Sequence, residues 1–130
     1  MRLHNISLQP LNPDSVQKAQ TRMPQKALLE VVVECFKALG DATRAKILYA
    51  LGKQPLCVRD LAIIIGISES AVSHQLSFLK DKRLVKVERS GNVMNYSIAY
   101  QHITKLLKEA EYYADHIRQN LPDHPGKNSD

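Results

Sequence analysis

The stretch from Ser68 to Lys80 carries short polar side chains at helical spacing. On a helix of about 100° per residue, its apolar side chains fall on one side and its small polar ones on the other. The polar side consists of Ser70, Ser73, His74 and Ser77. A face that is merely solvated usually carries Lys and Glu, which favour helix more than serine and histidine do. Short hydroxyls let a helix approach another surface closely while they offer donors and acceptors, so this face is predicted to make contacts.

The residues before this stretch are predicted to position it. Ser68 can cap the start of the helix, and Glu69 places a negative charge where the helix dipole favours one. Upstream, the apolar run from Val58 to Ile65 predicts a short helix, and Gly66-Ile67-Ser68 predicts a tight turn between the two helices. Two helices joined by a short turn with glycine, the second with a small polar outer face, are typical of a helix-turn-helix with its recognition helix.

The residues after Arg83 change from helical to strand periodicity. Apolar and polar residues alternate from Val85 to Glu88 and again from Met94 to Ile98. The four residues from Arg89 to Asn92 have the chemistry of a hairpin turn. A helix-turn-helix followed by a hairpin predicts a winged helix-turn-helix, a mainly α fold with a small β-hairpin wing. The tip of the wing is then expected to touch a neighbouring stretch of nucleic-acid backbone.

Other helices are expected around this unit. They are predicted at Asp14 to Met23 with Asp14 as cap, at Gln25 to Leu39, from the cap Asp41 to about Leu51, and at Gln101 to Asn120. The last of them is apolar although the compact unit is complete without it, which favours packing on a second subunit. We therefore expect a flexible arm at residues 1–23, a homodimeric domain at 24–120 with dimerisation helices at both ends, and a disordered tail at 121–130.

Composition narrows the class of function. The 130 residues carry a net charge of +5, which suits a polyanionic partner, and suffice for one domain. Only two cysteines are present, and no apolar run is long enough to span a bilayer, so we expect a cytoplasmic protein without a membrane partner. The sequence lacks a Cys-x-x-Cys pair, a Gly-rich phosphate loop and a His-Glu-x-x-His helix, so an enzyme is not expected. A winged helix that reads protein instead of DNA remains an alternative.

Three segments resemble the signature segments of the ArsR/SmtB repressors: Phe36 to Arg44, Leu56 to Leu61, and Ser68 to Leu76. The resemblance covers roughly residues 25–120 and is strongest to the zinc- and cobalt-sensing members. It implies a homodimeric repressor that binds a palindromic operator in double-stranded DNA until an effector releases it. The residues expected to contact DNA, from the resemblance and from the patterns above, are Ser68, Glu69, Ser70, Ser73, His74, Gln75, Lys80, Arg89 and Asn92.

The resemblance also implies a metal site between the last helices of the two subunits. The matching positions are Tyr100, His102, Tyr113 and His116, whereas the family pattern has Asp or Glu and His there. Helical spacing places His102, Glu109 and His116 along one stripe, so His102 of one chain could approach His116 of an antiparallel partner. Two imidazoles with a carboxylate suit zinc or another transition metal as the effector. The alternative is that both histidines are surface residues of a degenerate site.

The two cysteines suggest further sensor chemistry. Cys57 and Asp60 match two positions of a second metal site of the family, and a structural cysteine is the alternative. Cys35 falls on the apolar face of its helix, where a free thiol behaves as a small hydrophobe. A thiol-based redox-responsive repressor that uses Cys35 and Cys57 remains an alternative to metal sensing.

Overall fold

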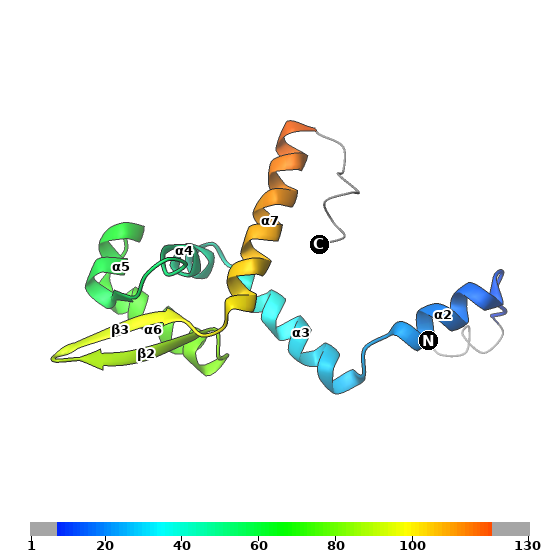
Figure 1. Cartoon of the computed structure of the whole chain (residues 1–130), viewed down its shortest axis with the longest axis horizontal. Coiled ribbons are helices and arrows are strands. Elements are labelled where there is room, and N and C mark those ends of the chain that lie inside the picture. The colour runs from blue at the N-terminus through cyan, green and yellow to red at the C-terminus, as the bar shows by residue number, and fades with distance from the viewer. Residues whose placement is uncertain (1–7, 121–130) are drawn as a thin grey trace. The chain divides into compact units, whose positions relative to one another are not determined.

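The computed structural model describes residues 8–120, so residues 1–7 of the expected arm and the whole expected tail at 121–130 lie outside the described residues. The chain divides into two compact units, the first ending at Glu34 and the second starting at Cys35. Its elements are α2 (Pro13–Arg22), α3 (Lys26–Leu39), α4 (Ala42–Ala50), β1 (Leu56–Cys57), α5 (Val58–Ile65), α6 (Glu69–Asp81), β2 (Val85–Ser90), β3 (Val93–Ile98) and α7 (Gln101–Gln119) (Figure 1).

Helix α2 forms where a short helix is expected, but its cap differs from the prediction. The side chain of Asn12 is the cap, and its Oδ1 accepts a hydrogen bond from the Ser15 N–H at 3.1 Å. Pro13 follows in the first turn, where its missing N–H leaves no hydrogen bond unmade. Asp14 is already inside the helix and pairs with Lys18 at 3.3 Å. The predicted cap at Asp14 is therefore wrong, because Pro13 sets the start of the helix.

Helix α3 presents its apolar face to solvent along most of its length. Leu28, Val31 and Phe36 are 59%, 66% and 57% exposed. Near its end the helix packs inward, because Ala38 is buried and Cys35 lies against the core. A contiguous exposed apolar face often marks a surface that contacts another molecule.

The core of the second unit forms where the sequence predicts it. Asp41 caps α4 by accepting a hydrogen bond from the Arg44 N–H at 3.0 Å. Helices α4, α5 and α6 then meet through side chains that are fully buried, namely Ile47, Leu48, Leu61, Val72, Leu76 and Leu79. The predicted apolar side of the recognition helix is therefore confirmed as the side that packs.

Helices α5 and α6 form the predicted helix-turn-helix. Their axes differ in direction by 110° across a break of three residues from Gly66 to Ser68, within the range of such motifs. Gly66 ends α5 in the left-handed conformation, with φ of 82°, which a side chain rarely adopts. No single helix among residues 8–120 is long and apolar enough to cross a membrane, and only the bent pair α5–α6 together meets that length and composition.

The wing is an antiparallel hairpin of β2 and β3, extended to three strands by β1 in the order β1-β3-β2. Strand β1 was not predicted, since its two residues pair with Tyr96 and Asn95 of β3 and carry no strand pattern of their own. The turn is shorter than predicted because Arg89 and Ser90 belong to β2. Gly91 and Asn92 alone connect the strands, and the φ of 64° at Gly91 suits a two-residue hairpin loop.

Within the second unit, the first half of helix α7 packs against the core. Ile103 and Leu107 are buried, and the Tyr49 hydroxyl of α4 donates a hydrogen bond to the Leu107 carbonyl at 3.2 Å. Beyond them most of the helix is exposed, with Tyr113 and Ile117 at 68% and 62%, whereas His116 is half-buried. Within one chain, therefore, only the apolar side chains in the first half of this helix are buried.

Candidate nucleic-acid interface

The outer face of α6 is built from the predicted stripe of small polar side chains. Ser68 caps the helix through a hydrogen bond from the Ala71 N–H to its Oγ at 3.0 Å, as expected. With the apolar side fixed in the core, the remaining side chains point outward. Ser70, Ser73, His74 and Ser77 are all exposed. The arrangement offers hydroxyl and imidazole groups on a narrow helix face, which is the chemistry that reads base edges in a major groove.

Glu69 lies at the first turn of α6 and faces Arg59 of α5. The Arg59 Nε and Glu69 Oε2 atoms are 3.5 Å apart, and their side chains are 77% and 56% exposed. An ion pair this exposed contributes little stability and exchanges easily with solvent or a ligand. Glu69 is therefore accessible at the start of the recognition helix, and its contact with DNA stays a prediction.

Gln75 differs from the other predicted contact residues of α6. It is half-buried, and its Oε1 accepts a hydrogen bond from Arg44 Nη1 at 3.4 Å. Its side chain is thus held by α4 at the boundary between the polar and apolar sides of the helix. The sequence suggested no role for Arg44, because the contact joins residues that lie far apart in the chain.

Basic side chains follow the polar stripe toward the wing. Lys80 is exposed at the end of α6, and Lys82 lies over the Phe78 ring at 5.7 Å from its centroid. Arg83 is in the left-handed conformation with φ of 62°, where the Leu84 N–H reaches back to the Leu79 carbonyl at 2.9 Å. This helix ending usually employs glycine, so Arg83 holds an exposed cation at some cost in backbone energy. Nothing in the sequence marked this conformation.

The tip of the wing carries the two predicted contact residues. Arg89, in β2, and Asn92, in the turn, are both exposed. Lys86 is also exposed on β2, but the odd spacing of three residues places it on the opposite face of the strand from Arg89. The wing therefore presents a cation and an amide close to its turn, both suited to phosphate oxygens.

The predicted metal ligands of α7 lie far apart within one chain. His102 and His116 are 14 positions apart, or about 21 Å at the rise of an α-helix. Glu109 is exposed between them. In the part of the chain that the structure describes, no three His, Cys, Asp or Glu side chains gather as metal ligands. A site that uses both histidines therefore needs a second chain.

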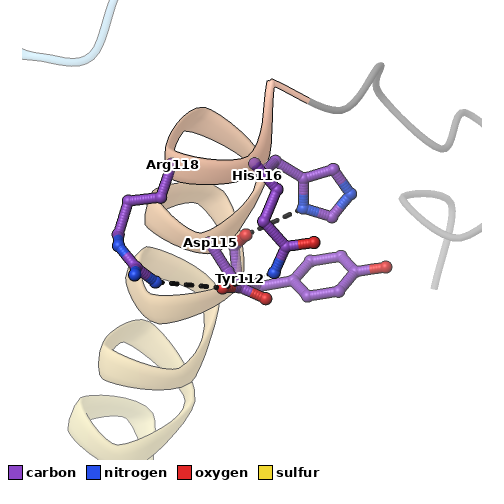
Figure 2. Close-up of polar contacts among 5 residues, drawn as sticks. Tyr112, Asp115, His116 and Arg118 are labelled. Atoms are coloured by element: carbon purple, nitrogen blue, oxygen red, sulfur yellow. Dashed lines mark hydrogen bonds and ion pairs between the residues drawn. The ribbon is translucent and has the colours of Figure 1, made fainter.

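His116 is oriented by its own helix (Figure 2). Its Nδ1 lies 2.9 Å from the Tyr112 carbonyl, and the Tyr112 ring meets it edge-on at 4.6 Å between centroids. Because a carbonyl can only accept, Nδ1 carries the proton and the neutral ring has its lone pair on Nε2. Such a bond to a backbone carbonyl is common behind metal-ligating histidines. Asp115, next to it, is held by Gln119 at 2.9 Å and Arg118 at 3.6 Å.

Comparison with known proteins agrees with this geometry. A family model described as "Bacterial regulatory protein, arsR family" matches residues 41–87, from the cap of α4 into β2. The transcriptional repressor SmtB homolog of Synechocystis sp. is 40% identical over 113 residues, which cover 86% of this chain and 83% of the relative. The chain belongs to the ArsR/SmtB family.

Other ArsR/SmtB relatives and structures extend the comparison. The cadmium resistance regulatory protein CadC homolog of Staphylococcus aureus is 35% identical over 77% of this chain and 83% of its own. The homodimeric winged helix-turn-helix DNA-binding domain of Mycobacterium bovis Mb0332 superposes with a TM-score of 0.69, at 28% identity, over 79% of this chain and 97% of its own. The predicted fold class is confirmed, and the chain is a transcriptional repressor of a DNA-binding family and not an enzyme.

Of the two cysteines of this ArsR/SmtB protein, Cys57 lines a surface pocket together with Glu69 of α6 and Asn92 of the wing. Cys57 is half-buried directly before α5, and Asp60 is exposed in the first turn of that helix. Cys35 is half-buried against the core, where the sequence placed it as a small hydrophobe, and both thiols are free. Their metal-binding and redox roles therefore stay predictions.

Proposed function

We propose that this ArsR/SmtB repressor binds a palindromic operator as a homodimer, with α6 in the major groove and the wing on the adjacent backbone. The observation that carries the proposal is the outer face of α6, where short hydroxyls and His74 are exposed above a fully buried apolar side. Charged side chains would be expected there if the face were only solvated. The basic residues at the end of α6 and in the wing supply sequence-independent attraction to phosphate.

A second copy of the chain is the partner that the exposed apolar helices require. Leu28, Val31 and Phe36 of α3 and Tyr113 and Ile117 of α7 are each more than half exposed. Self-association of these faces fits the homodimeric relative. Two recognition helices related by a two-fold axis would then occupy successive major grooves, with half-site centres about 34–36 Å apart.

Footprinting on DNA fragments selected by the protein tests this arrangement. We expect two inverted half-sites whose centres are separated by about one helical turn. Protection of a single half-site, or of two half-sites in direct repeat, would contradict the two-fold arrangement.

The proposed effector is a transition metal, with zinc first. His102 and His116 of opposite chains would approach each other if the α7 helices pair antiparallel, with Glu109 as a third ligand. The bond between His116 and the Tyr112 carbonyl supports this role, because it selects the tautomer in which Nε2 can act as a ligand. Zinc would release the operator by fixing the α7 pair in one geometry.

Operator affinity measured against zinc concentration tests the effector. Wild-type protein should release DNA, and His102→Ala should bind the operator normally but fail to respond to zinc. Glu109→Gln should weaken the response, whereas Glu111→Gln, two residues along the same helix, should not. The response should weaken in acid, because protons compete with zinc for the imidazole nitrogens. A full zinc response in His102→Ala would place the effector site elsewhere.

A further inference from the structure

Arg44 joins two elements that the sequence does not bring together. Its guanidinium donates from Nε to the Ala38 carbonyl at 2.8 Å and from Nη2 to the Lys37 carbonyl at 3.2 Å. The third guanidinium nitrogen, Nη1, donates to Gln75 Oε1 of α6 at 3.4 Å. The guanidinium lies over the Phe78 ring, with Cζ at 4.4 Å from the centroid.

The contacts of the Arg44 guanidinium with the α3 carbonyls and with the Phe78 ring are both favourable. The last carbonyls of α3 lie at the negative end of its dipole, so a cation is stabilising there. A guanidinium presents its donors in a rigid plane and stacks on aromatic rings, whereas the ammonium of lysine does neither to the same extent. Arg44 itself is held in place, because its backbone N–H is bonded to the Asp41 carboxylate.

On the α6 side, the two contacts restrain rotation about the helix axis. Gln75 and Phe78 are three residues apart, so they lie on one face of α6 as neighbouring turns. That face borders the exposed stripe, since Phe78 lies four residues, or about one helical turn, after His74. Holding Gln75 and Phe78 from one side therefore fixes the direction in which Ser73 and His74 point.

We propose that Arg44 is the positioning residue of the recognition helix: it ties the end of α3 to α6 and sets the rotation at which α6 enters the major groove. The inference rests on the proposed function of α6 as the DNA-reading element. It also gives Gln75 a role, which is to accept the bond from Arg44 and not to read a base. A recognition helix must be held within about 0.5 Å and 10–20° of its productive geometry, which packing and supporting hydrogen bonds provide.

The test compares operator DNA with random DNA for Arg44→Lys, which keeps the charge and loses the planar fork. The ratio of the two affinities should fall about tenfold, the lower end of what one base contact contributes. Affinity for random DNA and its salt dependence should stay unchanged, because the charge is retained. Lys46→Arg, an exposed change on the same helix, should leave the ratio as it is.

A stability control separates positioning from simple loosening of the fold. Ile47→Val removes one buried methylene from α4 and should lower the melting temperature while the affinity ratio is kept. If Arg44→Lys lowers the melting temperature in the same way and leaves the ratio intact, Arg44 is only a structural residue and the proposal is wrong. Equal loss on both DNAs would also overturn it, because that pattern belongs to a phosphate contact.

Gln75→Met provides a second variant that leaves the arginine in place. If Gln75 acts only through Arg44, the double variant Arg44→Lys/Gln75→Met should lose no more specificity than Arg44→Lys alone. Additive losses would show that Gln75 reads DNA independently, which contradicts the proposed linkage. His74→Ala distinguishes the two proposals. If this variant keeps the wild-type ratio of operator to random-DNA affinity, α6 is not the element that reads DNA. If His74→Ala lowers the ratio but Arg44→Lys keeps it, only the positioning role of Arg44 is rejected.

Discussion

At the scale of single residues, recognition depends on which side chains α6 leaves outside. Val72, Leu76 and Leu79 are fully buried, so the orientation of the helix on the core is determined by three contacts spread over two turns. The exposed residues opposite them are short and carry hydroxyl or imidazole groups. Because these side chains lose little conformational freedom on binding, a contact with a base edge need not offset a large entropic cost.

Ser73→Ala and His74→Ala should reduce discrimination between operator and random DNA. If each side chain contacts a base edge, the expected loss is about 1–3 kcal/mol of the difference in binding free energy. Fluorescence titrations with both DNAs measure it. His102→Ala, an exposed histidine of α7, is the control and should leave the difference unchanged. Equal weakening on both DNAs for His74→Ala would assign it to phosphate.

Arg89→Ala in the wing should act differently. A phosphate contact carries no sequence information, so affinity for both DNAs should fall alike. The slope of log affinity against log salt should become shallower by about one ion. Lys86→Ala, on the opposite face of the same strand, should keep most of the slope. A change in sequence preference for Arg89→Ala would mean instead that the wing reads bases.

At the scale of elements, the contact between α4 and α7 joins the DNA-binding core to the helix that carries the proposed metal ligands. The Tyr49 hydroxyl donates a hydrogen bond to the Leu107 carbonyl, and the side chains of Ile103 and Leu107 on the same helix are buried. Burial raises the pKa of Tyr49, and the nearby Glu111 carboxylate raises it further. The neutral phenol is therefore the form that the folded protein favours.

Tyr49→Phe should lower the free energy of unfolding at pH 7 by about 0.5–1.5 kcal/mol, the usual contribution of one hydrogen bond. In wild-type protein the contribution of the phenol is fully present below the unfolded pKa of about 10 and is lost as pH rises above it toward the raised value. Urea unfolding of the two proteins should therefore converge in strongly alkaline buffer. Tyr100→Phe, at an exposed tyrosine, should match wild type at pH 7. A constant difference between Tyr49→Phe and wild type across this pH range would contradict the assignment.

The elements differ in how far the sequence could predict them. Helix α5 matches its predicted bounds because an apolar run ends at Gly66, and α6 was evident from its cap and periodicity. Strand β1 could not be foreseen, since two residues become a strand only by pairing with β3. The same holds within the candidate site: exposure of the serine stripe follows from helical period, whereas the bond of Gln75 to Arg44 depends on tertiary packing.

At the scale of the whole molecule, α3 and α7 both carry apolar side chains that are more than half exposed, which fits the proposed homodimer. Ile117 shares its helix face with the inward-facing Ile103 but is 62% exposed. It therefore continues the docking stripe of α7 past the point where its own chain covers it. Leu107, by contrast, is buried within the chain, so changes there would disturb the fold together with any dimer.

Ile117→Glu should convert the homodimer to monomers, because it places a charge in the proposed apolar interface. Sedimentation velocity should show the lower sedimentation coefficient of a monomer. The affinity for the operator should fall to about the affinity for a single half-site. Lys108→Glu makes a larger change of charge on the opposite face of α7 and should remain dimeric. The far-ultraviolet circular dichroism of both variants should match wild type, since each position is exposed in the single chain. A dimeric Ile117→Glu protein with intact operator binding would move the interface away from α7, and with it the cross-subunit approach of His102 and His116.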